Sequence, residues 1–300
     1  MSAREEKVEL VVKNCGKLLE GPHWDGANDT LLFVDILGNA VHRYHPQTDK
    51  LQSVKIDENV GAVVPTKDGR TLIAGRHAFL FLDWTSGKLD QITAVDSDKP
   101  DNRFNDGKCD PAGRFWAGTM GPEKTPAEVL LNQGTMYCLN TDLKVTSHFD
   151  QVNISNGLAW SLDHKTMYYI DSLPGYLDAF DYNKVTGEIK NRRHILKVPN
   201  DEGLLDGMCI DSEGMLWIAM FSKSKVNRYN PNTGEKLKTI TFPATNVTSC
   251  CFGGKDYDEL YVTVSAEGIS EEELQKQPLA GSIFKVTGLG VRGLPANIFG

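Results

Sequence analysis

The stretch that decides the fold is NDGKCDPAGRFWAG, residues 105–118, where polar residues lead directly into an apolar run. Its central Asp-Pro-Ala-Gly sequence favours a turn between two antiparallel strands. The same pattern occurs six times: a mostly polar residue, a small residue, a short strand, a turn and an apolar strand. The other copies begin at residues 20, 60, 156, 206 and 248, as EGPHWDGANDTLLFVD, VGAVVPTKDGRTLIAG, NGLAWSLDHKTMYYID, DGMCIDSEGMLWIAM and TSCCFGGKDYDELYVT.

Glycines anchor the first five copies at intervals of 40 to 50 residues, at Gly21, Gly61, Gly107, Gly157 and Gly207. A second strand pair lies between copies, as in residues 225–242, KVNRYNPNTGEKLKTITF. Four strands in every 40 to 50 residues are typical of a β-propeller blade. The sequence therefore predicts an all-β, six-bladed β-propeller with four antiparallel strands per blade, in one domain over residues 1–300.

Both ends of the chain carry strand patterns that could close the ring. We expect residues 8–13 to pair with residues 281–290, which would remove an open sheet edge. Helical signals are sparse. Residues 125–134 read as a short helix or an ordered loop, and SEEELQKQ predicts a helix with Ser270 as N-cap and Glu273 at the capping-box position.

The composition excludes several classes of protein. The 300 residues carry a net charge of −8, with 40% hydrophobic and 24% charged residues. This acidic balance argues against nucleic-acid binding, which needs a basic face. No apolar run reaches the length of a membrane span, and the N-terminus lacks the apolar core of a signal peptide. We expect a cytoplasmic protein, with nuclear entry left open, six reduced cysteines, and no membrane or obligate protein partner.

A ring of oxygen-bearing side chains is expected at one end of the central channel. The inner strands of a propeller begin at the same face, so the residues before the anchor glycines should meet there. These residues are Glu20, Val60, Asp106, Asn156 and Asp206, with Asn105 one step earlier in the third copy. Carboxylates and amides suit a hard divalent ion such as Ca²⁺, Mg²⁺ or Mn²⁺.

The alternative explanation of this ring is local. Polar residues before a glycine often form turns and hydrogen-bond their own backbone. Glu20 fits that explanation least, because Glu is a poor turn residue. Several carboxylates around a narrow axis would also be costly without a cation. The ring therefore predicts one metal site in the central channel.

Residues 101–120, DNRFNDGKCDPAGRFWAGTM, resemble a fingerprint of the senescence-marker/gluconolactonase family. Further matching motifs lie at residues 154–172, 206–219, 248–263 and 284–293, so the resemblance covers about residues 18–293. It implies a six-bladed propeller with one divalent ion (Ca²⁺, Mn²⁺, Mg²⁺ or Zn²⁺) at the end of the channel. The implied activity is the hydrolysis of sugar lactones, which makes a small sugar lactone the expected partner.

The resemblance also implies site residues. It places the metal ligands at Glu20, Asn156 and Asp206, and the substrate contacts at Arg103, Asn105 and Glu123. The ring argument selects the same three ligands, together with Asn105. One departure is Leu205, where the family carries proline before the metal-binding aspartate.

Asp206 is our candidate for the catalytic carboxylate, as the general base or the group that orients the attacking water. Lys108 and Asp110 are expected to stabilise the turn rather than take part in chemistry. Two alternatives stay open: a non-enzymatic calcium-binding regulatory protein, and an esterase or organophosphatase that uses the same metal site.

Overall fold

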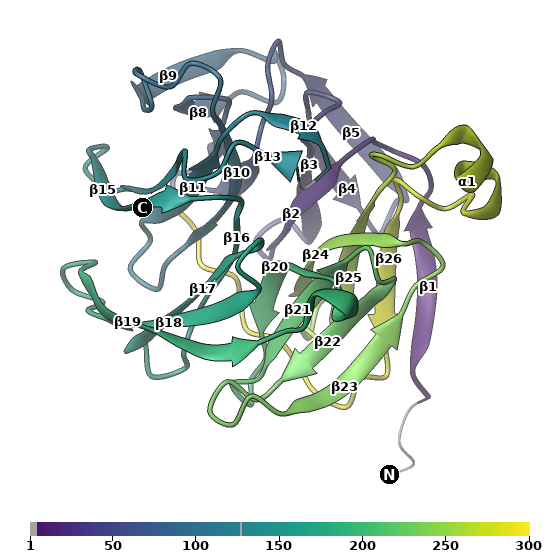
Figure 1. Ribbon diagram of the computed structural model, residues 1–300. Helices are drawn as coiled ribbons and strands as arrows, with labels where there is room; N and C mark the ends of the chain where they lie inside the picture. Colours follow the sequence, from purple (N-terminus) through teal and green to yellow (C-terminus); the bar gives the residue numbers. More distant parts are fainter. Residues whose placement is uncertain (1–4, 127) are drawn as a thin grey trace.

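The computed structural model describes residues 5–126 and 128–300, and it forms six four-stranded antiparallel sheets around a central channel (Figure 1). The prediction of an all-β, six-bladed propeller with four antiparallel strands per blade is confirmed. In Figure 1 the inner strands β2, β10, β16, β20 and β24 lie near the middle, and β5, β9, β15, β19, β23 and β1 lie at the rim. The expected domain range of 1–300 includes residues 1–4 and 127, which lie outside the described residues.

The first three blades each use one continuous part of the chain, ordered here from channel to rim. Blade 1 comprises β2 (Leu19–Asp25), β3 (Thr30–Asp35), β4 (Ala40–His45) and β5 (Lys50–Lys55). Blade 2 comprises β6 (Ala62–Pro65), β7 (Thr71–Ala74), β8 (Ala78–Leu82) and β9 (Leu89–Ala94). Blade 3 comprises β10 (Arg103–Cys109), β11 (Phe115–Met120), β14 (Gly134–Leu139) and β15 (Val145–Val152).

The other three blades follow in chain order, and the last of them joins the two ends of the chain. Blade 4 comprises β16 (Ser155–Trp160), β17 (Thr166–Asp171), β18 (Tyr176–Tyr182) and β19 (Ile189–Lys197). Blade 5 comprises β20 (Leu204–Ile210), β21 (Leu216–Phe221), β22 (Lys225–Tyr229) and β23 (Lys236–Thr241). Blade 6 comprises β24 (Asn246–Gly253), β25 (Glu259–Ser265), β26 (Ile283–Thr287) and, at its rim, β1 (Lys7–Val12). The antiparallel pairing of β1 with β26 confirms the predicted ring closure.

The hydrophobic core is divided among the spaces between neighbouring blades. Among the described residues, six apolar clusters form, and each joins residues of two adjacent blades. Trp116 and Trp217 are fully buried in two of them. Because apolar burial is the main favourable term in folding, the blades are stable only when packed against one another.

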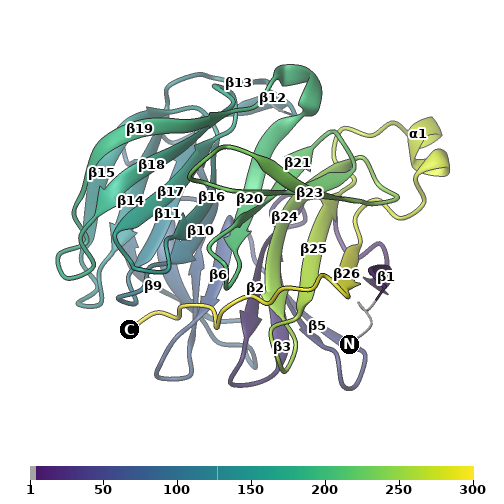
Figure 2. The same cartoon turned by 90° about the horizontal axis from the view of Figure 1, so that it is seen from below.

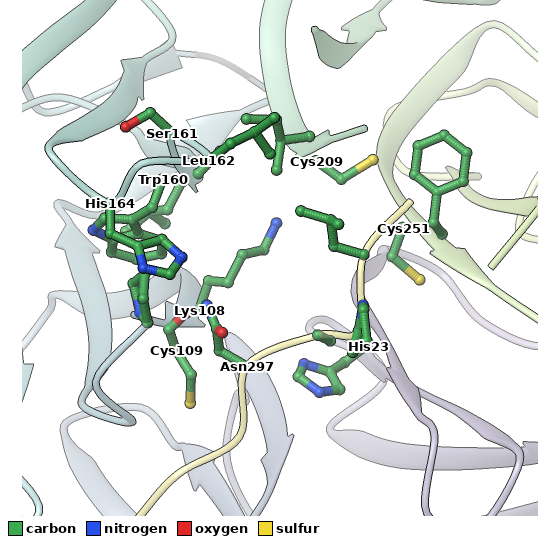
Figure 3. A pocket seen from close by; sticks show the side chains of 18 of the residues that line it. His23, Lys108, Cys109, Trp160, Ser161, Leu162, His164, Cys209, Cys251 and Asn297 are labelled. Carbon is green, nitrogen blue, oxygen red and sulfur yellow. Dashed lines mark hydrogen bonds between the residues drawn. The ribbon is translucent and has the colours of Figure 1, made fainter. Parts of the chain in front are cut away.

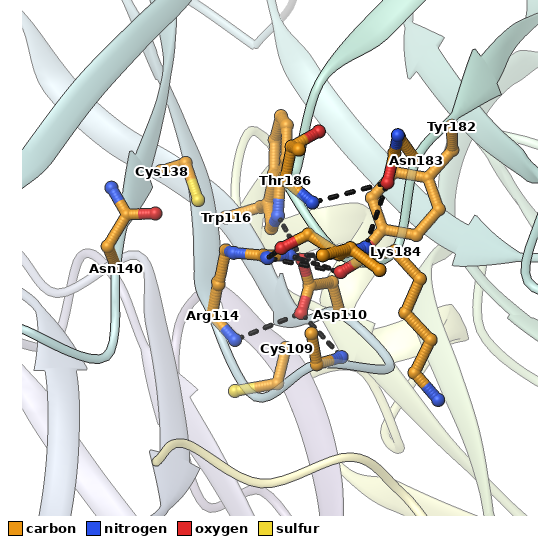
Figure 4. Close-up of polar contacts among 12 residues, drawn as sticks. Cys109, Asp110, Arg114, Trp116, Cys138, Asn140, Tyr182, Asn183, Lys184 and Thr186 are labelled. Carbon is orange, nitrogen blue, oxygen red and sulfur yellow. Dashed lines mark hydrogen bonds and ion pairs between the residues drawn. The ribbon is translucent and has the colours of Figure 1, made fainter.

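The turn that follows β10 is fixed by a buried carboxylate (Figure 4). Asp110 accepts hydrogen bonds from the backbone N–H of Arg114 at 2.9 Å and the indole N–H of Trp116 at 3.0 Å. The Tyr182 hydroxyl in blade 4 donates to the same carboxylate at 2.7 Å. Arg114 pairs with Asp110 and reaches the backbone carbonyl of Val185, so the turn also fastens blade 3 to blade 4. Asp110 therefore stabilises this turn, as predicted.

Among the described residues, four short elements lie outside the blades. Strands β12 (Glu123–Thr125) and β13 (Glu128–Val129) form a small hairpin, so the helical alternative for residues 125–134 is wrong; Ala127 lies outside the described residues. Helix α1 (Glu271–Lys276) is capped by the Ser270 side chain, which accepts from the Glu273 N–H and confirms the predicted helix start. A 3₁₀ turn, η1, covers Asn200–Glu202. No described helix is long and apolar enough to span a membrane.

The C-terminal segment, residues 288–300, follows β26. It crosses one face of the propeller, which we call the lower face (Figure 2). The β12–β13 hairpin lies on the opposite, upper face. Asn297 donates to the Cys109 carbonyl in blade 3, and the Gly300 N–H donates to the Gly113 carbonyl. The sequence does not predict these contacts, because contacts between residues so distant along the chain leave no local pattern.

Candidate metal and substrate site

The structure brings all six predicted site residues to one pocket at the upper end of the channel. Its other lining residues lie in or just before the inner strands, at the ends of the second strands and in the connections that follow them. The predicted residues in the pocket are Glu20, Arg103, Asn105, Glu123, Asn156 and Asp206. Their proximity is therefore established, whereas their individual roles stay predictions.

Bulges in the inner strands accompany the predicted ring residues. The pairing register shifts next to Glu20 in β2, Asp106 in β10, Asn156 in β16 and within residues 205–208 in β20. A bulge bends its strand and redirects a side chain, and such bulges are common beside active sites. Blade 2 carries Val60 at the equivalent place, and its β6–β7 pairing has no such shift.

The anchor glycines allow the inner strands to approach closely. A Cβ atom on Gly157 would lie 2.8 Å from the backbone carbonyl oxygen of Asp206 in the next blade. A Cβ on Gly207 would lie 2.0 Å from the Ser249 hydroxyl of the blade after that. At these two positions glycine therefore lets neighbouring inner strands lie close together.

A relay of hydrogen bonds orients the Asn156 amide. Its Nδ2 donates to the Ser172 hydroxyl at 2.8 Å, and that hydroxyl donates to the Leu205 carbonyl at 2.6 Å. Because Nδ2 is used in this way, Oδ1 is left as a buried acceptor with no partner among the described residues. Leu205, the departure from the family pattern, thus contributes its backbone carbonyl to this relay. The substitution leaves Asp206 in the ring.

Three buried carboxylates belong to the ring. Burial raises the pKa of Glu20 above its ordinary value, and the nearby Asp106 charge adds to the rise. Burial also raises the pKa of Asp206, with further contributions from the charges of Glu20 and Asp106. One oxygen of Glu20 accepts from the Gly21 N–H and one of Asp106 from the Gly107 N–H. The local explanation, a hydrogen bond to the neighbouring backbone, therefore accounts for one oxygen of Glu20 and of Asp106. It does not explain why the carboxylates are buried beside one another.

These residues fit a divalent cation. Asn156 Oδ1 and Asp206 Oδ1 are both buried without partners among the described residues, which is costly unless a ligand pairs with them. A cation would also relieve the repulsion that raises the carboxylate pKa values. Within the described residues, no three His, Cys, Asp or Glu side chains are arranged as a metal site. The candidate ligand set is therefore mixed, with Glu20, Asp206 and the Asn156 amide.

Arg103 forms the positive side of the pocket. Its guanidinium donates to Asn105 Oδ1 at 2.6 Å and pairs with Glu123 at 3.3 Å. Asn105 in turn donates from Nδ2 to the Ser155 carbonyl at 2.8 Å. The side chain of Arg103 is largely buried, so its pair with Glu123 is not an exposed surface salt bridge. The three predicted substrate-contacting residues thus form one connected group.

Sequence analysis missed Ser172 and Glu267, which also line the pocket. Burial raises the pKa of Glu267 to about 7, and the charge of Glu123 adds to the rise. Position in the repeat could have identified both, because Ser172 follows β17 and Glu267 follows β25. Glu123 likewise follows β11, the second strand of its own blade. The segments after the second strands therefore supply a second tier of side chains at the upper face.

Lys108 does not have the predicted role. Its ammonium group crosses the channel and donates to the Met208 carbonyl of blade 5, so it does not bind the turn after β10. Asp106, which precedes its anchor glycine, is buried and bonded to that glycine's N–H. It contributes negative charge to the ring, in keeping with its lower rank as a ligand.

Comparisons with known proteins place this architecture in a family. The chain matches the model of the SMP-30/Gluconolactonase/LRE-like region over residues 18–266. It is 49% identical to regucalcin from Xenopus laevis over 98% of both chains. A solved luciferin-regenerating enzyme has 35% identity and a TM-score of 0.90, covering 98% of this chain and 99% of its own.

A second solved structure is described as a calcium-binding protein, regucalcin, from Agrobacterium tumefaciens. It has 27% identity and a TM-score of 0.90, covering 97% of this chain and 96% of its own. Together with the quoted motifs, these matches confirm the resemblance, which extends beyond residues 18–266 to nearly the whole chain. The chain therefore belongs to the SMP-30/gluconolactonase/LRE-like family, with regucalcins as full-length relatives.

Proposed function

We propose that this chain is a metal-dependent hydrolase that opens sugar lactones, with one divalent ion held by Glu20, Asn156 and Asp206. The observation that carries the proposal is the pair of buried, unpartnered ligand oxygens, Asn156 Oδ1 and Asp206 Oδ1, among the described residues. They lie in the same pocket as the donors Arg103 and Asn105. Membership of the gluconolactonase-like family supports the reaction class.

Lactone hydrolysis needs a polarised carbonyl, an activated water and a proton for the ring oxygen. A divalent ion, when bound, supplies Lewis-acid polarisation and makes a water molecule more acidic. The water oxygen bonds to the carbonyl carbon, the ring C–O bond breaks, and the released ring oxygen takes up a proton. Asp206 would accept the proton of the attacking water or orient that water. Its burial supports this role, because a desolvated carboxylate is a stronger base.

Arg103, Asn105 and Glu123 would orient the sugar. Asn105 uses one Nδ2 hydrogen on the Ser155 carbonyl, and its second hydrogen can be donated to the substrate. Arg103 is held by Asn105 and Glu123, so its guanidinium is positioned before substrate arrives. Such fixed donors stabilise developing negative charge without reorganisation. Glu123 would accept from sugar hydroxyls.

The test uses the purified chain and D-glucono-δ-lactone. The protein is treated with a chelator, and Ca²⁺, Mn²⁺, Mg²⁺ and Zn²⁺ are then restored one at a time. We expect chelation to abolish turnover and at least one ion to restore it. Glu20→Gln and Asp206→Asn should lose at least about 100-fold in kcat/KM with circular dichroism unchanged. Glu188→Gln, a surface carboxylate in a salt bridge with Lys190, is the control and should be fully active.

Full activity of the wild type in chelator, or of either site variant, would contradict the metal mechanism. Two other results would redirect the proposal. Ca²⁺ binding without turnover of any lactone would favour a non-enzymatic calcium-binding protein, the description carried by the Agrobacterium tumefaciens relative. Turnover of a phenyl ester or a phosphate triester in place of lactones would favour an esterase or organophosphatase at the same site.

A further inference from the structure

A second cavity lies at the lower end of the channel, at the face opposite the candidate metal site (Figure 3). We call it the lower cavity, and its volume is about 250 Å³. Its walls come from the lower ends of the inner strands of blades 1, 3, 4, 5 and 6. The C-terminal segment, through residues 294–297, forms part of its rim.

The lower cavity differs from the upper pocket in charge. Four carboxylate residues line the upper pocket: Glu20, Glu123, Asp206 and Glu267. Among the described residues, no aspartate or glutamate lines the lower cavity, and Lys108 is its one lysine or arginine. In a chain with a net charge of −8, this is a local site for a negative guest.

Lys108 is placed to receive an anion. Figure 3 shows its side chain projecting into the middle of the cavity from β10. Its ammonium group donates to the Met208 carbonyl, its one described hydrogen bond, and no described carboxylate forms an ion pair with it. An ammonium group has three donors, so two stay available to a ligand.

Two further polar groups in the cavity wall lack partners. His23 Nε2 and Trp160 Nε1 are both buried, and neither has a hydrogen-bond partner among the described residues. An indole N–H can only donate, so an acceptor is what would satisfy Trp160. A buried polar group without a partner is costly unless a water or a ligand pairs with it. Trp160 therefore favours a guest that carries acceptor oxygens, whereas His23 Nε2 can donate or accept, depending on the tautomer of the ring.

The rest of the wall is mainly apolar. Leu162 in the turn after β16, Phe252 in β24 and Pro295 in the C-terminal segment provide apolar surface. A fully hydrated anion such as phosphate would leave this surface without a partner. A soft-metal site is also disfavoured, because no described cluster of three His, Cys, Asp or Glu is arranged to hold an ion.

We propose that the lower cavity binds a small organic monocarboxylate with a compact apolar body. The carboxylate accepts hydrogen bonds from Lys108, and the body packs against Leu162, Phe252 and Pro295. A space of about 250 Å³ is the share of about eight water molecules, which suits a ligand the size of benzoate. For so few atoms, the expected Kd is on the order of millimolar.

The test titrates the full-length protein with benzoate and with benzamide, its neutral analogue, by ligand-observed NMR. Chelator is present throughout, so that benzoate cannot bind through an ion in the upper pocket. We expect benzoate to bind and benzamide to bind at least tenfold more weakly. Lys108→Met keeps an apolar side chain of similar length and should weaken benzoate binding at least tenfold. Lys50→Met, on exposed β5, is the control and should bind as the wild type does.

A second pair of variants avoids the channel interior, in case Lys108→Met fails to fold. Leu294 lies at the rim and is 42% exposed, so polar residues should be tolerated there. Leu294→Glu should weaken benzoate binding at least threefold, whereas the neutral Leu294→Gln should weaken it less. The proposal is overturned if benzamide binds as tightly as benzoate, or if benzoate does not bind up to tens of millimolar. It is also overturned if folded Lys108→Met binds benzoate as the wild type does, or if the two Leu294 variants weaken benzoate binding equally. It does not depend on the proposed lactonase activity.

Discussion

Ser172→Ala is the most direct test of how the candidate metal site is held. The Ser172 hydroxyl accepts from Asn156 Nδ2 and donates to the Leu205 carbonyl, and it is buried. Replacing it with alanine removes both bonds and leaves an amide donor and a carbonyl acceptor without partners. The Asn156 amide would then be free to turn Nδ2 toward the ligand position.

The size of the effect follows from these contacts. A buried polar group left unpaired costs about 1–3 kcal/mol, so the free energy of unfolding should fall by about 2 kcal/mol. The loss of an outer partner typically lowers metal affinity by about 10–100-fold. We therefore expect a clear loss of ion affinity that exceeds what a general loss of stability would produce.

The assay separates the two effects. Ca²⁺ and Mn²⁺ binding are measured by isothermal titration calorimetry, and stability by urea unfolding in chelator. The matched control is Ser282→Ala, because Ser282 is also buried and makes two hydrogen bonds, both to Asn14 near the β1–β26 seam. Ser282→Ala should lose similar stability and keep its ion affinity. If Ser172→Ala binds the ions as tightly as the wild type does, the hydrogen-bond relay is not what orients Asn156.

Three further predictions concern the ring and its supports. In chelator, the raised pKa of Glu20, about 8, means that its contribution to stability is present below the ordinary value of 4.5 and is lost as pH rises through 8. Unfolding in chelator against pH should show this decline, and added ion should reduce it; a flat profile would contradict the burial of the charge. Gly157→Ala places a Cβ 2.8 Å from the Asp206 carbonyl, so it should cost about 1–3 kcal/mol of stability and weaken ion binding, both measurable by thermal unfolding with and without ion. Asp110→Asn should lower stability by about 3 kcal/mol, because the buried partner of Arg114 is lost, while ion affinity in calorimetry stays unchanged.

The repeat made the fold predictable from the sequence. In each copy the strands and the turn between them can be recognised from a short stretch of sequence. Because a propeller blade is built from such local strand pairs, recognising them was enough to predict the fold. The proximity of the candidate ligands was predictable for the same reason, because Glu20, Asn156 and Asp206 hold equivalent positions in their copies. The second copy fits the same reasoning. It has Val60 in place of a polar residue, and its β6–β7 pairing also lacks the bulge.

Features that depend on distant segments were not predictable. Ser172 acts between two blades, through the Leu205 carbonyl of the next one. The C-terminal segment reaches the channel from beyond blade 6, with no repeated pattern to mark it. Glu267 shares its place after a second strand with Ser172 and Glu123, but that place alone does not reveal its contacts. The reach of Lys108 to Met208 joins residues 100 positions apart, so the sequence around Lys108 suggested a turn contact instead.

The third copy also explains why the two ends of the channel differ in chemistry. Asp106 and Lys108 are two residues apart on β10, so their side chains point to the same face of the strand. Asp106 adds to the carboxylates of the upper ring, and burial raises its pKa, a rise that the charge of Lys108 partly offsets. Lys108 itself faces the lower cavity. A divalent cation entering from the lower face would meet the Lys108 ammonium before any carboxylate. Ion and lactone are therefore both expected to enter from the upper face, where Arg103 and the ring residues line the same pocket.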